Sequence, residues 1–325
     1  MARRDIIVIG ASAGGIEVLE TVLSSLPWDF RAAVFVVLHT TEDSPGLLPG
    51  ILNRHSQMPV LYAVHNAPIL PSRVYIAPGG ARHMLLERGK IRLLPGPREN
   101  RNRPSVDALF RSAARAYGSQ VIGVVLTGNL DDGAAGLADI KLRGGVAIVQ
   151  DPDEAIAPSM PASAVESTEV DYVLPAEAIG PKLQELAATE AVEGVHPING
   201  ESNMAATGQT YSCPECGGVL KEIQESGVVR YRCRVGHLYS PESLLADQGV
   251  AVEKALWAAI RNLEEQAEFS DKLAVNSRKK QHLRLAKRFS EKAEASRENA
   301  SVLRDLLQKA ADQVFEAPEE RTGTQ

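Results

Sequence analysis

Cysteine, long apolar runs and a strong excess of either charge are all scarce in this chain of 325 residues. Only three cysteines occur, all between positions 213 and 233, and such an odd, clustered set suits metal binding in a reducing cytoplasm better than a disulfide framework. The lack of a long apolar run excludes a membrane span. A formal net charge of −6 argues against a dedicated nucleic-acid binder. The opening residues MARRD lead into a strand-like segment without a small-residue cleavage site, so we expect no secretory signal and a cytoplasmic protein.

Apolar runs rich in valine and isoleucine alternate with amphipathic segments through the first 190 residues. The runs at 5–10 and 34–38 are typical of buried parallel strands, and apolar residues recur between them at helical spacing. Further strands are expected at 74–77, 121–126, 146–149 and 172–174, a hairpin at 83–96, and helices at 105–116 (N-cap Ser105), 134–143, 159–166 and 176–189. This alternation predicts an α/β fold with a mostly parallel sheet covered on both faces.

The pattern changes beyond residue 190. We expect a domain at 1–190, a polar linker at 191–210, a compact Cys/Gly module at 211–245, a helical hairpin or coiled coil at 246–316, and a disordered tail at 317–325. Apolar and small residues keep a helical spacing of three to four from Ala286 to Val314, and again from Leu256 to Ala267. Two helices joined near Asn276-Ser277 would form an antiparallel pair or join a partner bundle, and the sequence leaves both open.

The turn after the first predicted strand carries a serine between glycines, Gly10-x-Ser12-x-Gly14. This spacing matches a nucleophile elbow, in which a sharp strand-to-helix turn exposes a serine hydroxyl beside a helix N-terminus. A dinucleotide-binding fingerprint would need glycine in place of Ser12 and an acid at the end of the second strand, where His39 stands. Tight packing of the turn is the third interpretation.

A nucleophilic serine needs a base, and the base needs an acid that orients it. His39 ends the second predicted strand, and Asp131 and Asp132 follow the strand at 121–126. Since ligand chemistry gathers at the carboxyl ends of parallel strands, these side chains are expected at one edge of the sheet with Ser12. The order Ser, His, Asp along the chain differs from that of the common α/β hydrolases.

Five blocks in order, IGASAGG, VVLHT, RNRPSVDALFRSAA, LTGNLDDGAAGL and QDPDEAIAPSMPASA, resemble the catalytic domain of CheB, the chemotaxis protein-glutamate methylesterase, over about residues 3–190. The resemblance implies a doubly wound sheet and a triad of Ser12, His39 and Asp132. It further implies hydrolysis of glutamate methyl esters on chemoreceptor-like proteins, with possible deamidation of glutamines, and no cofactor for catalysis. The resemblance includes no receiver domain, so we expect no phosphorylation control from that source. A non-catalytic adaptor that keeps the esterase fold as a scaffold is the alternative.

Two departures from the family bear on the substrate groove. The family usually has Met and Gly where this chain has Asn129 and Leu130, and often Thr where it has Ala13. Ala13 and Asn129 are therefore candidate substrate contacts. Arg98 and Arg101 lie in a basic loop and could hold an acidic receptor helix, or the loop could simply be solvated. For the oxyanion we expect N–H groups of the turn after Ser12 and of the Gly128-Asn129 segment.

The cysteine module contains two ligand pairs, Cys213 with Cys216 and Cys233 with His237. A hairpin-length spacer separates them, as in a zinc ribbon. The spacing predicts a structural zinc site of three sulfurs and one nitrogen, which would supply folding energy to a segment too short for a large core. Three free thiols in a loop is the alternative. We expect the module and the helical tail to dock proteins, a methyltransferase or other signalling partners, rather than nucleic acid.

Overall fold

The computed structural model describes residues 3–40, 46–80, 82–191 and 211–315. The chain divides into two compact units, Met1–Leu245 and Ala246–Gln325. The predicted disordered tail and nearly all of the predicted linker lie outside the described residues.

The centre of the first unit is a sheet of seven parallel strands in the order β3-β4-β2-β1-β7-β8-β9. The strands are β1 (Ile6–Ala11), β2 (Ala33–Leu38), β3 (Val60–Tyr62), β4 (Arg73–Ile76), β7 (Val121–Val125), β8 (Val146–Gln150) and β9 (Tyr172–Leu174). Every residue of β1 and β2 is buried, which explains why these strands read as continuous apolar runs rather than as alternating ones. The predicted α/β class with a doubly wound parallel sheet is confirmed.

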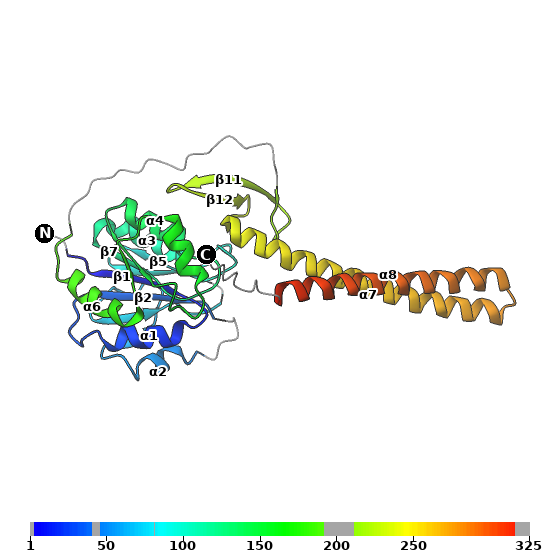
Figure 1. Ribbon diagram of the computed structural model, residues 1–325, viewed down its shortest axis with the longest axis horizontal. Helices are drawn as coiled ribbons and strands as arrows, with labels where there is room; N and C mark the ends of the chain where they lie inside the picture. The colour runs from blue at the N-terminus through cyan, green and yellow to red at the C-terminus, as the bar shows by residue number, and fades with distance from the viewer. Residues whose placement is uncertain (1–2, 41–45, 81, 192–210, 316–325) are drawn as a thin grey trace, which may run out of the picture. The chain divides into compact units, whose positions relative to one another are not determined.

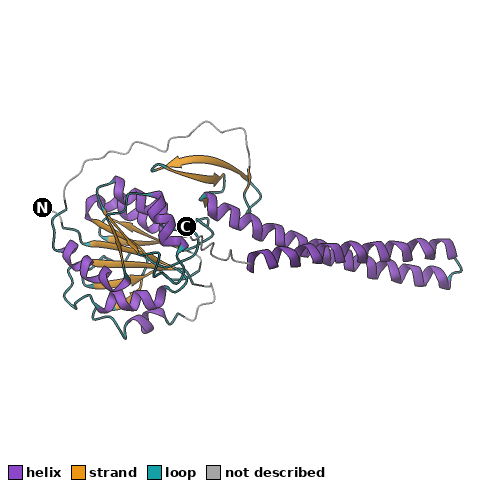
Figure 2. Ribbon diagram, viewed as in Figure 1, coloured by secondary structure: helices purple, strands orange, loops and turns teal. Residues whose placement is uncertain are grey.

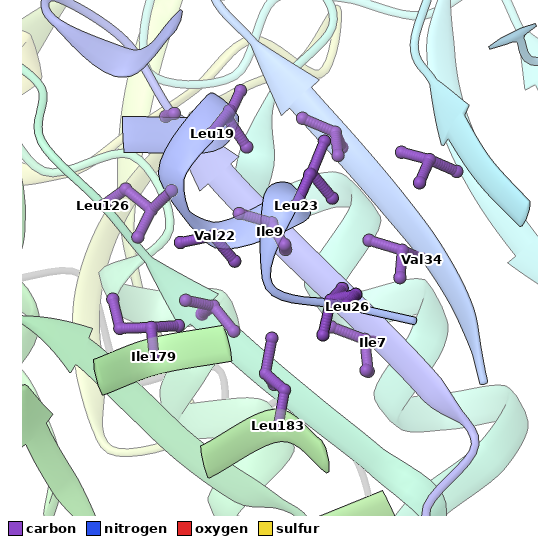
Figure 3. Packing of buried hydrophobic residues seen from close by; sticks show 14 of the residues in the cluster. Ile7, Ile9, Leu19, Val22, Leu23, Leu26, Val34, Leu126, Ile179 and Leu183 are labelled. Atoms are coloured by element: carbon purple, nitrogen blue, oxygen red, sulfur yellow. The ribbon is translucent and has the colours of Figure 1, made fainter. Parts of the chain in front are cut away.

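Helices cover both faces of this sheet (Figures 1 and 2). One face carries α1 (Gly15–Ser24), α2 (Leu48–Leu52) and α6 (Ala176–Ala187), and the other carries α3 (Val106–Tyr117), α4 (Ala134–Leu142), α5 (Ser159–Ser167) and the hairpin of β5 (His83–Glu87) and β6 (Lys90–Leu94). Figure 3 shows the first of these interfaces, where Leu19 and Leu23 of α1 meet Ile9 of β1. Each face therefore has its own apolar core, and the sheet is held rigidly between them.

Close packing against α3 explains why a glycine, Gly10, stands near the end of β1. A Cβ there would lie 2.2 Å from Val106 Cγ1, so only glycine allows the N-terminus of α3 to approach the sheet this closely. That approach brings the first turn of α3 to the strand ends where the candidate site lies. The short helix α2 and the edge strand β3 were not predicted from the sequence.

A small antiparallel sheet completes the first unit. Its strands β10 (Tyr211–Ser212), β11 (Val219–Glu225), β12 (Val228–Cys233) and β13 (Leu238–Tyr239) pair in that order. The β11–β12 hairpin occupies the spacer between the two predicted ligand pairs. We call residues 211–240 the ribbon.

The second unit is an antiparallel pair of helices, formed by the body of α7 (Pro241–Lys279) with α8 (Leu283–Phe315). Two hydrogen bonds between the helices show the antiparallel order. Arg278, near the end of α7, bonds Ser290 near the start of α8, whereas the earlier Gln266 bonds the later Ser296. Small buried residues line the seam: Ala267, Ser270, Ala274, Ser277, Ala286, Ala293, Ser296 and Ala300. The helices join at residues 280–282, a few positions beyond the predicted Asn276-Ser277 junction, because helix formers continue to Lys279. None of the described helices combines the length and the apolarity needed to cross a membrane.

Candidate active site

Ser12 and His39 follow two neighbouring strands at the same level of the sheet. Ala11 of β1 is in register with Leu38 of β2, so Ser12 and His39 take the next positions on strands that lie about 4.8 Å apart. The backbone ties them together, since the His39 N–H donates to the Ala11 carbonyl at 3.1 Å. The Ser12 hydroxyl carries no hydrogen bond in the described residues, so its bond to the imidazole stays a prediction.

His39 is paired with Asp132, which comes from the turn that leads into α4. The two meet through His39 Nε2 and Asp132 Oδ2 at 2.9 Å, with side-chain exposures of 12% and 1%. Because an ionised carboxylate only accepts hydrogen bonds, Nε2 carries the proton and Nδ1 of the neutral ring is left as the base.

Five donors converge on the Asp132 carboxylate. Oδ2 accepts from His39 Nε2 and from the Val106 N–H, both at 2.9 Å. Oδ1 accepts from Ser105 Oγ at 2.9 Å, from the Asp107 N–H at 3.1 Å and from Asn100 Nδ2 at 3.2 Å. Burial alone would raise the pKa of Asp132, but the hydrogen bond and charge of His39 and the two N–H groups at the start of α3 outweigh it and lower the pKa below its usual value. The carboxylate is therefore held in its charged form.

Ser105 is the N-cap residue of α3, but its side chain does not cap the helix. The predicted N-cap position is confirmed, but the hydroxyl of Ser105 donates to Asp132, and the carboxylate of Asp132 accepts from the first N–H groups of α3 in its place.

Asp107 in the first turn of α3 caps α4, since its carboxylate accepts hydrogen bonds from N–H groups at the start of that helix. Its Oδ1 accepts from the N–H groups of Gly133 and Gly136 at 3.0 and 2.7 Å. Its Oδ2 accepts from Asn100 Nδ2 at 2.7 Å and from the Arg230 guanidinium at 2.9 Å. Burial raises the pKa of Asp107 to about 6; the Arg230 charge lowers it and the nearby Asp132 carboxylate raises it. The two aspartates thus cap each other's helices and share one polar network.

Two hydrogen bonds with Thr127 hold the turn that carries Ser12. The Ser12 N–H donates to the Thr127 carbonyl at 2.9 Å, and Thr127 Oγ1 donates to the Ala13 carbonyl at 3.0 Å. Gly128 packs directly on the serine, since a Cβ there would lie 2.8 Å from Ser12 Cβ. These contacts hold Ser12 on rigid elements.

Part of the oxyanion prediction is wrong. The Gly128 N–H donates to the Ala157 carbonyl at 2.9 Å, so it has no capacity for a second acceptor. In the described residues the N–H groups of Ala13, Gly14 and Asn129 carry no hydrogen bond. Ala13 and Gly14 lie at the N-terminus of α1, where the helix dipole favours negative charge.

The predicted substrate contacts fall into two groups. Ala13 and Asn129 are exposed beside Ser12 and Gly128. Arg98 and Arg101 are half-buried in the loop before α3, and Arg98 forms an ion pair of 3.8 Å with Glu215 of the ribbon. Leu130 adopts a φ of 63°, a left-handed conformation that favours the glycine usual in the family it resembles.

Cys213, Cys216, Cys233 and His237 form a cluster whose ligand atoms all lie within 4.8 Å of one another. Cys216 Sγ is 3.7 Å from Cys233 Sγ, and His237 Nδ1 is 3.6 and 3.4 Å from the sulfurs of Cys213 and Cys233. Ligands at the distances zinc prefers, about 2.3 Å for sulfur and about 2.0 Å for nitrogen, lie about 3.5–3.8 Å apart in a tetrahedron. The donor set and its spacing fit a tetrahedral zinc ion.

Sequence reasoning missed Asn100, Asp107 and Arg230. Asn100 immediately precedes the block RNRPSVDALF and Asp107 lies within it, where an acid in the first turn of a helix is an ordinary stabilising feature. Arg230 lies more than a hundred residues away in a basic stretch of the ribbon, and no sequence signal connects it with Asp132.

This arrangement, with a serine, a histidine and an aspartate at the carboxyl ends of β1, β2 and β7, is the one that a serine-type α/β hydrolase needs. Comparisons with known proteins agree with that class. The family model of the CheB methylesterase matches residues 7–183, and the chain belongs to this family.

The relatives align with a similar share of this chain, 52–57%. The crystal structure of the Thermotoga maritima CheB methylesterase catalytic domain aligns with a TM-score of 0.54 and 36% identity, over 57% of this chain and 99% of that one. An Anaeromyxobacter dehalogenans protein and a Xanthomonas campestris protein, each named protein-glutamate methylesterase/protein-glutamine glutaminase 2, are 44% and 42% identical over 185 and 174 residues. These alignments span 54% and 49% of the relatives, about half their length. A relative in Leptospira interrogans is 43% identical over 53% of this chain and 90% of its own length.

Proposed function

We propose that this chain hydrolyses the methyl esters of glutamate side chains on a chemoreceptor-like signalling protein, and that the same site deamidates glutamines. The observation that carries the proposal is the partly buried His39–Asp132 pair, 2.9 Å between Nε2 and Oδ2, at the strand position next to Ser12 in a chain of the CheB methylesterase family. The names of the relatives support the two activities for this chain.

The reaction follows from the roles of three side chains. Nδ1 of His39 takes the proton of the Ser12 hydroxyl as its oxygen attacks the ester carbonyl, and Asp132 stabilises the imidazolium that forms. The N–H groups of Ala13 and Gly14 stabilise the negative oxygen of the tetrahedral intermediate. The imidazolium returns the proton to the leaving methoxide, and methanol departs. Water then attacks the acyl-enzyme through the same base and releases the glutamate side chain. With glutamine the leaving group is ammonia.

Two further assignments accompany this mechanism. We assign Ala13 and Asn129, which are exposed near Ser12, to contact with the receptor segment beside the ester. The arginines Arg98 and Arg101 lie on the loop before α3, where positive charge favours an acidic receptor helix. Docking of a methyltransferase or another signalling protein by the helical pair stays a prediction.

A fluorophosphonate probe, which labels activated serines, tests the triad without a receptor. We expect labelling of the wild-type chain and none of Ser12→Ala. Ser24→Ala is the matched control, because Ser24 is exposed on α1 and donates only to the Thr21 carbonyl. Release of methanol from a methylated receptor fragment tests the substrate. A wild-type chain that neither reacts with the probe nor releases methanol would support the adaptor hypothesis instead.

A further inference from the structure

Arg230 is a ribbon residue whose side chain is buried in the polar network of the candidate active site. It lies on β12, and both it and Asp107 have side-chain exposures of 1%. Its guanidinium contacts Asp107 Oδ2 at 2.9 Å and Asn100 Oδ1 at 3.1 Å. Because Arg230 belongs to the ribbon and Asp107 to the sheet domain, this buried pair forms only when the ribbon is folded and lies against the sheet domain.

Arg230 and the Ser240 N–H together fix the orientation of the Asn100 amide. Asn100 Oδ1 accepts from Arg230 and from the Ser240 N–H, both at 3.1 Å. The amide nitrogen is consequently directed at the two aspartates, 2.7 Å from Asp107 and 3.2 Å from Asp132. The ribbon thus contacts the triad aspartate through one intervening side chain.

Other ribbon contacts converge on the same two segments. The Asn100 N–H donates to the Leu238 carbonyl at 2.8 Å, and the Leu238 N–H donates to the Arg98 carbonyl at 3.3 Å. Just after the ribbon, Ser243 Oγ donates to Asp131 Oδ1 at 2.7 Å, on the residue that precedes Asp132. The loop before α3 and the turn before α4 are both fixed from this side.

The ribbon itself has little else to fold on. Its apolar cluster consists of Cys213, Leu220, Cys233 and Tyr239 together with Leu244 of α7, and two of the four ribbon residues are candidate metal ligands. The donor atoms of Cys213, Cys216, Cys233 and His237 lie within 4.8 Å of one another, so a metal ion bound there would join the two ends of the ribbon and supply folding energy.

We propose that Cys213, Cys216, Cys233 and His237 bind a zinc ion, and that the metal-folded ribbon holds Arg230 against Asp107 and Asn100, so that the reactivity of the triad depends on the metal. The coupling rests on the proposed function of Ser12, His39 and Asp132. Arg230 is a positioning residue in this scheme, since it reaches the reacting groups only through Asn100 and Asp107.

The metal is tested first, on the full chain. We expect about one zinc ion per chain by elemental analysis, and a tetrahedral thiolate absorption spectrum after replacement by cobalt. Cys216→Ser should lose both, whereas the matched control Ser212→Ala, an exposed neighbour, should keep both. A purified chain that holds no zinc and takes up no cobalt would overturn the metal site.

The coupling is tested by the second-order rate of Ser12 labelling by the fluorophosphonate. We expect about a tenfold lower rate after chelation and in Arg230→Met, equivalent to about 1.4 kcal/mol. Arg230→Lys should recover part of the rate because it restores the charge. Arg232→Met, on the same strand and 30% exposed, is the matched control. Circular dichroism and thermal unfolding will show whether each variant is folded.

The pH profile distinguishes positioning from packing. Loss of Arg230 removes a charge that lowers the pKa of Asp107, so the acid limb of the labelling rate should move to higher pH in Arg230→Met and move back in Arg230→Lys. The charged groups that face Asp107 and Arg230 are Asp131, Asp132, Glu99 and Arg111, with His39 behind Asp132. A folded Arg230→Met with an unchanged profile and rate, or a chelated chain as reactive as the zinc form, would refute the coupling while leaving the esterase intact. Absence of labelling in the wild-type chain would refute the esterase itself.

Discussion

The sheet domain and the ribbon are built on different physical principles. Two apolar clusters, one on each face of the sheet, include buried side chains from every sheet strand except β9, together with six helices and the β5–β6 hairpin. The ribbon has four buried residues clustered with Leu244 of α7, and it also makes hydrogen bonds and ion pairs to the sheet domain. Burial of apolar area suffices for the first, whereas a segment of about thirty residues needs a metal or a partner surface.

This contrast shows how chemistry and support can be divided within one chain. The sheet domain supplies all three side chains of the proposed triad from the ends of rigid strands. The ribbon supplies none of them, but it contributes one buried cation and several backbone bonds to the loops around Asp132. Substitutions in the two regions should therefore differ in kind as well as in size.

The largest effect is expected from Asp132→Asn in the sheet domain. An amide would place donors against N–H groups and would favour the wrong tautomer of His39, so the labelling rate should fall by about 10³–10⁴-fold. Asp131→Asn, one residue earlier, is the matched control, with an expected change within about tenfold. Comparable losses in both variants would contradict the assignment of Asp132 as the partner of His39.

Core truncation should affect the sheet domain alone. Leu23 is fully buried between α1 and the sheet (Figure 3), and Leu23→Ala should lower the free energy of unfolding by about 2–5 kcal/mol.

Chelation of the metal, in contrast, should leave the sheet intact. Hydrogen exchange measured segment by segment will compare the amides of β1 and β2 with those of β11 and β12. Faster exchange in β1 and β2 after chelation would show that the sheet also depends on the metal.

A smaller effect, dependent on pH, is expected from Asp107→Asn, which mimics the protonated acid. The pKa of Asp107 is raised to about 6, so the wild-type side chain is ionised at pH 8 and takes up a proton as the pH falls through 6. The variant should react about tenfold more slowly at pH 8, because Arg230 loses its carboxylate partner, and the difference should narrow below pH 6. The ratio of labelling rates from pH 5 to 9 measures this, and a constant ratio would contradict it.

The comparison also explains what could be predicted from the sequence. The strands at 6–11 and 33–38 were predictable because buried parallel strands are continuous apolar runs. The location of the candidate site at one edge of the sheet was predictable because the carboxyl ends of parallel strands lie at the same edge. The short strand β3 and helix α2 gave weak signals, since Leu48–Leu52 contains Pro49 and spans only five residues. Local patterns could not reveal that Asp132 would cap α3 or that Arg230 would meet Asp107, because these contacts join segments far apart in the chain.

The junction of the two long helices shows the same limit on a local scale. Gln281 makes the turn with a φ of 61°, a conformation in which glycine or asparagine is more usual. Since the residues around it, Lys279, Lys280 and His282, are ordinary in helices, nothing in the sequence marked the position of the turn.

The smallest effect is expected in the helical pair, which differs from both other regions. Arg304 pairs with Glu264 across the two helices, but the two side chains are 51% and 41% exposed, so solvent screens the pair. Arg304→Ala should change the free energy of unfolding by no more than about 0.5 kcal/mol. Ala293→Leu in the fully buried seam should cost about 1–3 kcal/mol instead, because the helices pack too closely for a larger side chain. If denaturant unfolding of the full chain gave the two variants equal losses, surface charge rather than the alanine seam would hold the helices together.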